Sequence, residues 1–161
     1  MDQVLLLVEA ALVAGPGLWM AVAVFDNWRH PRLNEAAVAT VVRLDLLAQD
    51  YPEDFALIAH RRIDAPRTIR RLFWAIRLAE TVAAAALIGS ALLLLLAAGA
   101  LVPVALATGA AIVSAAFFTL IWAGFLIGGN YFAYWYCHQW AQSNHFMLMV
   151  WGLLVLLVLK P

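Results

Sequence analysis

The side chains that could do chemistry lie in or beside two apolar stretches of the sequence. Arg77 and Glu80 are the charged residues that interrupt the apolar run 72–98, while His138, Gln142 and His145 follow one another at i, i+4 and i+7. On helices, these spacings place Arg77 with Glu80 on one face, and the two imidazoles with the amide on another. Because an unpaired charge inside a bilayer costs several kcal/mol, we expect these five side chains to face the protein interior and to converge.

Two interpretations of this polar cluster stay open. In the simpler one, which the sequence favours, Arg77 and Glu80 neutralise each other, the Arg77 side chain reaches toward the membrane surface, and the other polar groups bridge helices. In the second, Glu80 with His145 or His138 binds a ligand headgroup, a proton or a metal ion. Contact with another protein is a third possibility.

Cofactor and catalytic chemistry find little support. His138 and His145 are two helical turns apart, and no cysteine or carboxylate cluster completes a metal shell. Bis-His haem needs imidazoles on facing helices, but His30 and His60 lie in a polar interval. No phosphate loop, nucleophile elbow or HExxH helix is present. We therefore predict no catalytic residues, no metal and no resident cofactor, and lean toward a protein that is not an enzyme, while a bound lipid or quinone is compatible with the cluster.

Composition defines the solvent in which these residues must be positioned. Of 161 residues, 66% are hydrophobic and 12% are charged, whereas about a quarter are charged in soluble proteins. The chain is therefore expected to be an integral membrane protein. Its formal net charge of zero gives no reason to expect a nucleic-acid partner, and its single cysteine, Cys137, excludes an internal disulfide.

Four segments are long and apolar enough to cross a bilayer, which takes about 20 helical residues. The predicted spans are 4–25, 70–98, 104–127 and 131–159. Residues 147–159 alone are too short, so the last helix is expected to begin near Tyr131; the alternative is a surface-lying helix to residue 142 followed by a short span. The favoured fold is all-α, with the whole chain, 1–161, forming one four-helix transmembrane domain.

The polar interval 26–65 is too long to lack structure, so short helices are expected there. Asn34 is a candidate N-cap for an amphipathic helix, and a second helix is expected to start at Pro52 and end near Arg62. Arginines gather in this interval and at the start of the next helix, whereas Lys160 is alone on the opposite side. The positive-inside rule then predicts a cytoplasmic loop and periplasmic termini.

Two groups of residues suggest contacts with helices and lipid. Small residues that would admit a neighbouring helix are Gly124, Gly128 and Gly129. An aromatic belt at headgroup level is predicted from Tyr131, Tyr134, Trp135, Tyr136 and Trp140.

The run from Gly128 to Trp135, followed by Trp140 and Phe146, resembles the signature of a family of bacterial predicted small integral membrane proteins, domain of unknown function 2165. Arg62-Ile63-x-x-Pro66, with Glu80 in the following helix, resembles a second part of that pattern. Asn130 stands where an acidic residue is common in the family. The resemblance implies four transmembrane helices and carries no established activity.

Together these features favour a non-catalytic protein of the bacterial inner membrane, an accessory or assembly subunit of a larger membrane complex with partner subunits. The motivation is a small bundle with small-residue faces and an aromatic belt, but no catalytic motif. The alternative is a binder or carrier of a quinone, a lipid headgroup or a proton. It would use the polar cluster Glu80, Arg77, His138, Gln142 and His145.

Overall fold

The computed structural model describes residues 3–159, and these form helices joined by short turns, with no strand among them. Four helices are long and apolar enough to cross a membrane: α1 (Gln3–Arg29), α5 (Pro66–Ala98), α6 (Val104–Tyr131) and α8 (Gln139–Val158). The expected all-α fold with four such helices is confirmed. Lys160, which entered the orientation argument, lies outside the described residues.

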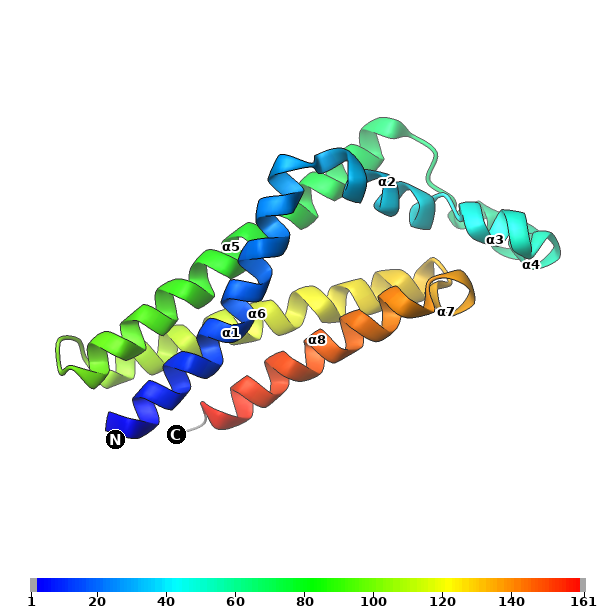
Figure 1. Ribbon diagram of the computed structural model, residues 1–161. Coiled ribbons are helices and arrows are strands. Elements are labelled where there is room, and N and C mark those ends of the chain that lie inside the picture. Colours follow the sequence, from blue (N-terminus) through cyan, green and yellow to red (C-terminus); the bar gives the residue numbers. More distant parts are fainter. Residues whose placement is uncertain (1–2, 160–161) are drawn as a thin grey trace.

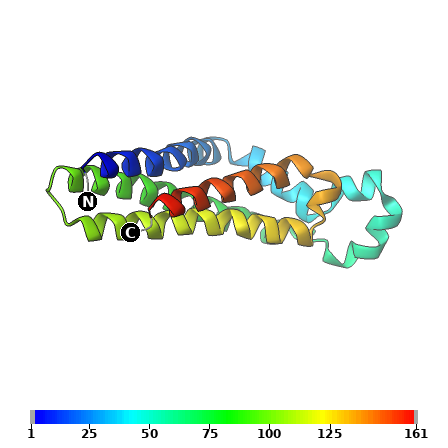
Figure 2. The same ribbon diagram turned by 90° about the horizontal axis from the view of Figure 1, so that it is seen from below.

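The long helices pack in the order α1, α5, α6, α8. Contacts are extensive between α1 and α5, between α5 and α6, and between α6 and α8, but sparse between α1 and α8. Figures 1 and 2 show the start of α1, the α5–α6 turn and the end of α8 at one end of the molecule, and the short helices at the other. The bundle is therefore tight at the terminal end and open at the end where the short helices lie.

Small residues allow the close helix contacts. A Cβ on Gly17 of α1 would lie 3.0 Å from Leu87 Cβ of α5, and a Cβ on Gly152 of α8 would overlap the Thr119 side chain of α6. Between α5 and α6, the hydroxyls of Ser90 and Ser114 hydrogen bond at 2.8 Å. In the membrane, where helices gain little from hydrophobic burial against each other, such close packing stabilises the bundle.

The predicted packing glycines behave differently. A Cβ on Gly124 or Gly128 would meet no atom within 4 Å, whereas one on Gly129 would overlap the Tyr134 ring. Gly129 therefore packs against the turn that follows its own helix. That Gly124 and Gly128 admit a neighbouring helix stays a prediction.

The prediction of one helix over residues 131–159 is wrong. Helix α6 continues to Tyr131, a turn follows at Ala133, which is left-handed (φ 55°), and a short α7 (Tyr134–Cys137) precedes a second break at His138 (φ −125°). The chain turns here because the Tyr134 ring folds back over Gly129, where no Cβ blocks it. Helix α8 then has 20 residues, about 30 Å, which is still long enough to cross a bilayer core.

The interval between α1 and α5 contains α2 (Pro31–Val42), α3 (Asp45–Asp50), α4 (Pro52–Ile58) and the 3-10 turn η1 (Ala59–Arg61). The start at Pro52 is confirmed. Asn34 is not an N-cap, because α2 begins at Pro31, where the proline ring suits the first helical turn. Leu44, with a left-handed φ of 57°, separates α2 from α3. Arg61 Nη1 donates to the backbone oxygen of Tyr131 at 3.0 Å, which ties this interval to the end of α6.

Candidate functional site

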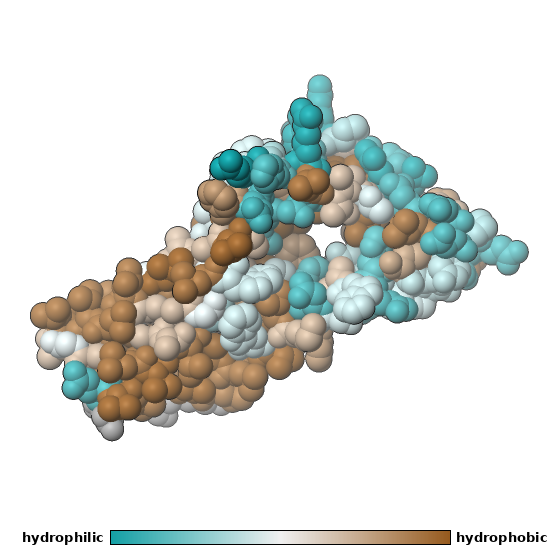
Figure 3. Space-filling model, in the orientation of Figure 1, coloured by the Kyte–Doolittle hydropathy of each residue, from teal (hydrophilic) through white to brown (hydrophobic). Residues whose placement is uncertain are grey.

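A cavity of about 490 Å³ lies where the α1–α5 pair and the α6–α8 pair diverge. Figure 3 shows an opening through the molecule near this point, at the boundary between the brown apolar bundle and the teal polar end. Side chains of α1, α2, α5, α6, α7 and α8 form its walls, together with His138 between α7 and α8. We call it the Glu80 cavity; its polar lining residues are Asn27, Asn34, Thr40, Glu80, His138, Asn144 and His145.

Glu80 is held by a hydrogen-bonded chain that crosses three helices. Its side chain is 7% exposed, and its Oε2 accepts a 2.9 Å hydrogen bond from Asn27 Nδ2. The Nδ2 of Asn34 in turn donates to Asn27 Oδ1. Sequence reasoning missed Asn27 because it follows the apolar run of the first span, and it assigned Asn34 to a helix cap. The sequence signal that could have identified Asn27 and Asn34 is that the two amide side chains lie on either side of a helix break.

His145 faces the same cavity from α8. Its ring centroid lies 4.6 Å from that of Phe125, 5.3 Å from Trp122 and 5.8 Å from Tyr134. Among the described residues, nothing hydrogen bonds with the buried Nδ1 of His145. This nitrogen is therefore available to a ligand that enters the cavity, and the surrounding rings favour a flat group beside it.

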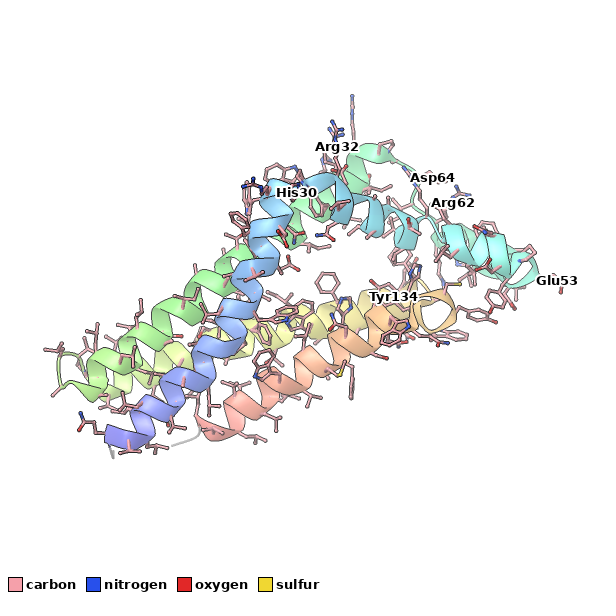
Figure 4. The ribbon with its side chains drawn as sticks, in the orientation of Figure 1. His30, Arg32, Glu53, Arg62, Asp64 and Tyr134 are labelled. Carbon is pink, nitrogen blue, oxygen red and sulfur yellow. The ribbon has the colours of Figure 1, made fainter. Side chains whose placement is uncertain are left out.

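His138 lines the cavity beside Tyr134, with ring centroids 5.5 Å apart. Burial lowers the pKa of His138, which favours the neutral imidazole. Tyr134 itself is buried, and burial raises the pKa of its phenol. Figure 4 labels Tyr134 at the turn between α6 and α8. Tyr134 is a predicted member of the aromatic belt at headgroup level, but Gly129 lets its ring fold inward, so that the side chain is buried as a wall of the cavity.

Arg77 does not pair with Glu80. The two salt bridges in residues 3–159 are Arg62–Asp64 and Arg70–Glu35. Instead, the Arg77 guanidinium carbon lies 4.0 Å from the Trp28 ring centroid and 3.7 Å from that of Trp74, and Nη1 donates to the backbone oxygen of Asn27 at 3.3 Å. Arg77 is 4% exposed, so it does not extend to the surface as expected. The simpler interpretation, mutual neutralisation, is not the arrangement observed.

Gln142 also lies apart from the Glu80 cavity. It lines a separate depression with Trp135, Gln139 and Ser143. His138 is the N-cap of α8 and accepts a 3.0 Å hydrogen bond from the backbone N–H of Gln142, but its non-helical φ of −125° keeps the two side chains from sharing one face. Ala141 and Asn144 occupy the cavity face of α8 together with His145.

The remaining belt residues are accessible to different degrees. Tyr131 and Trp135 are half exposed and Trp140 is 91% exposed, as lipid-facing or headgroup-facing side chains would be. Tyr136 is partly covered, and its ring packs edge-on against Tyr51 at 5.0 Å. A place for these four at headgroup level stays a prediction.

An apolar groove of about 420 Å³ adjoins the Glu80 cavity, and is bounded by α2, α5 and α6. Gly124 and Gly128 line it, and their missing side chains widen it. The groove and the cavity have five wall residues in common: Val38, Val41, Ile76, Phe125 and Tyr134. The Glu80 cavity and the apolar groove therefore lie side by side, separated by single side chains.

The arrangement of candidate ligands offers no evident metal centre. Within residues 3–159, no group of three or more His, Cys, Asp or Glu side chains lies close enough to hold a metal ion. What the cavity offers is hydrogen bonding: one carboxyl group, two imidazoles and amides, next to an apolar groove.

The chain matches a known protein family. A family model described as predicted small integral membrane protein, domain of unknown function 2165, matches residues 5–161, which include all four long helices and the cavity residues. No curated protein and no solved structure matches the chain.

Proposed function

We propose that this chain, which belongs to the family of predicted small integral membrane proteins, domain of unknown function 2165, binds a neutral amphipathic small molecule of the bilayer. The observation that carries the proposal is the common wall of the Glu80 cavity and the apolar groove. A ligand with a compact polar head and a long apolar tail could place the head beside Glu80 and His145, and the tail between α5 and α6.

The chemistry of the cavity favours a flat head with carbonyl or hydroxyl groups. Asn27 and Asn34 carry amide groups, and His145 Nδ1 lacks a partner among the described residues. The rings of Trp122, Phe125 and Tyr134 surround that imidazole. Because Glu80 supplies the carboxyl group and no arginine or lysine of residues 3–159 lines this cavity, an anionic headgroup is disfavoured. An isoprenoid quinone has the required head and tail.

The test is binding of a short-tailed quinone to the purified full chain in mild detergent, followed by tryptophan quenching and by equilibrium dialysis. Glu80→Gln and His145→Leu should each weaken binding about tenfold, since one lost hydrogen bond in a buried site costs roughly 1.4 kcal/mol. Glu9→Gln is the matched control, because Glu9 is a similarly buried carboxyl group of α1 that does not line the cavity. Equal affinities for wild type, the control and both cavity variants would overturn the proposal.

An accessory role in a larger membrane complex is the second candidate, and Gly124 and Gly128 favour it. No atom of the described chain would meet a Cβ at either position, so a helix of a partner subunit could approach α6 there. Gentle extraction from the native membrane, native-gel sizing and mass spectrometry distinguish the candidates. A stoichiometric partner that persists in Glu80→Gln and is lost in Gly124→Leu supports the accessory role; a single species carrying quinone supports the ligand.

We also propose that the protein lies in the bacterial inner membrane with the short-helix end in the cytoplasm. Support comes from the arginines of residues 29–71, which belong to that end of the molecule. Glu53 is exposed on α4, and Figure 4 labels it at the tip of that end. In a Cys137→Ser background, Glu53→Cys should react with a membrane-impermeant maleimide only after cell lysis. Labelling of intact spheroplasts would reverse the orientation.

A further inference from the structure

Another cavity, of about 510 Å³, lies between α2 and the first turns of α5, and its charge differs from that of the Glu80 cavity and of the apolar groove. Four guanidinium groups and one carboxylate line it: Arg32, Arg43, Arg70, Arg77 and Glu35. The carboxylate of Glu35 is already engaged by Arg70 Nε at 3.4 Å. We call this the Arg77 cavity. It carries a strong excess of positive charge and is open to solvent or lipid.

Arg77 is the buried member of this group and lacks an anionic partner within residues 3–159. It is 4% exposed, and its Nε has no hydrogen-bond partner among the described residues. One end of the guanidinium is fixed by the backbone oxygen of Asn27, and its position is maintained by the rings of Trp28 and Trp74. Trp28 is itself anchored by its Nε1, which donates to Thr81 Oγ1 at 3.1 Å. A cation preorganised in this way, without a counterion in the described chain, indicates an anion site.

The depth of the cavity identifies the class of anion. Residues 78–97 of α5 are 20 residues, about 30 Å of helix, and all of them except Glu80 are apolar or weakly polar, so this segment matches the hydrocarbon core in length. Arg77 then lies at the boundary between hydrocarbon and headgroups. Trp28 and Trp74, each 49% exposed, are the side chains that favour this interface. An anion bound here lies at the level of lipid phosphates.

We propose that the Arg77 cavity binds the phosphate group of an anionic phospholipid. Guanidinium groups bind phosphate oxygens with paired hydrogen bonds, and several positive charges around one phosphate favour a lipid of net negative charge over phosphatidylcholine, whose quaternary ammonium they repel. This site is independent of the quinone proposal, because the Arg77 and Glu80 cavities have only Phe73 in common and their charged residues differ.

The experiment is native mass spectrometry of the full chain in mild detergent, with phosphatidylglycerol or phosphatidylcholine added at matched concentrations. The cavity variant is Arg32→Gln with Arg43→Gln, which leaves the buried Arg77 and the Glu35–Arg70 pair intact. The control is Arg67→Gln with Arg71→Gln, an equal loss of charge from two exposed residues of α5 that do not line the cavity. Wild type and control should retain phosphatidylglycerol over phosphatidylcholine, and the cavity variant should lose at least roughly fivefold of that preference.

A variant with the opposite effect makes the test independent of folding damage. Glu35→Gln removes the one carboxylate of the cavity and frees Arg70, so it should bind phosphatidylglycerol more tightly than wild type does. Equal lipid preference in all four proteins overturns the proposal. Displacement of phosphatidylglycerol by inorganic phosphate at comparable concentration overturns the assignment to lipid, since the source would then be free phosphate.

Discussion

The hydrogen bond between Asn27 and Glu80 gives the sharpest test of the site, through a double-mutant cycle. The single changes are Asn27→Leu, which removes the donor at nearly constant volume, and Glu80→Gln, which replaces one oxygen of the acceptor carboxyl group with an NH2 group. Both side chains are at most 7% exposed, and the Nδ2–Oε2 distance is 2.9 Å. If the contact is formed as observed, the two changes must be non-additive in stability.

The magnitude follows from the kind of bond. A hydrogen bond to a charged group contributes about 1.5–3 kcal/mol in soluble proteins, but polar contacts between membrane helices average about 0.6 and reach about 1.7 kcal/mol. Because the amide oxygen introduced by Glu80→Gln could still accept weakly from Asn27, we expect a coupling energy of about 1 kcal/mol. For a chain of this size that is a shift of roughly 2–4 °C in Tm.

The assay is thermal unfolding of wild type, both single variants and the double variant in one detergent. Ser90→Ala serves as the control partner, because it breaks the hydrogen bond to Ser114 between α5 and α6 away from the cavity. Asn27→Leu and Ser90→Ala should be additive within about 0.5 kcal/mol. A coupling between positions 27 and 80 no larger than this control would refute the hydrogen-bonded chain and, with it, the positioning of Glu80.

Further predictions concern packing and titration. Gly152→Ala places a methyl group against Thr119 and should destabilise the protein by about 1–3 kcal/mol, whereas Gly124→Ala, in open space, should be neutral or slightly stabilising in the same unfolding assay. Burial, and then the negative charge of Asp50, raise the pKa of the Cys137 thiol. Iodoacetamide at pH 8 should therefore alkylate Cys137 more slowly than it alkylates glutathione, and equal rates of alkylation would contradict this. Burial lowers the pKa of His138 in the folded state. The contribution of the neutral imidazole to folding stability is therefore complete above the ordinary histidine pKa of about 6.5, and it declines as the pH falls below that value. Tm should therefore fall less between pH 7 and pH 5 in His138→Gln than in wild type, and parallel curves would show that His138 is not responsible.

The long helices could be predicted from the sequence because the features that specify them are local. Runs of twenty or more apolar residues and Pro at positions 52 and 66 determine where helices exist and begin, and both prolines do start helices. The break before α8 carries no such signal. Ala133 adopts a left-handed conformation without being Gly or Asn, and it does so because Tyr134 packs over Gly129. A contact between side chain and backbone of this kind is not visible in periodicity.

The ionisable residues of the candidate site could be predicted from the sequence, but the residues that they contact could not. Glu80 and His145 could be located because polar side chains in a membrane span must face the interior, and both line one cavity. Asn27 was missed because the apolar run that defines the first predicted span ends at residue 25, whereas α1 continues to Arg29. Helical spacing could not show that Arg77 and Glu80 line different cavities. The position of the Arg77 side chain depends on Trp28, which belongs to α1, and on Trp74, which lies one turn earlier on α5.

Asn27 explains how two opposite charges, three residues apart on α5, belong to different cavities. Its side-chain amide binds Glu80, while its backbone oxygen accepts from Arg77. Direct pairing of the two charges would satisfy both at lower cost, because each buried ion otherwise loses hydration without a counterion. The structure instead keeps Glu80 beside neutral hydrogen-bonding groups and Arg77 beside three other arginines. The end of α1 therefore keeps the two side chains apart, because Asn27 offers a different polar group to each of them.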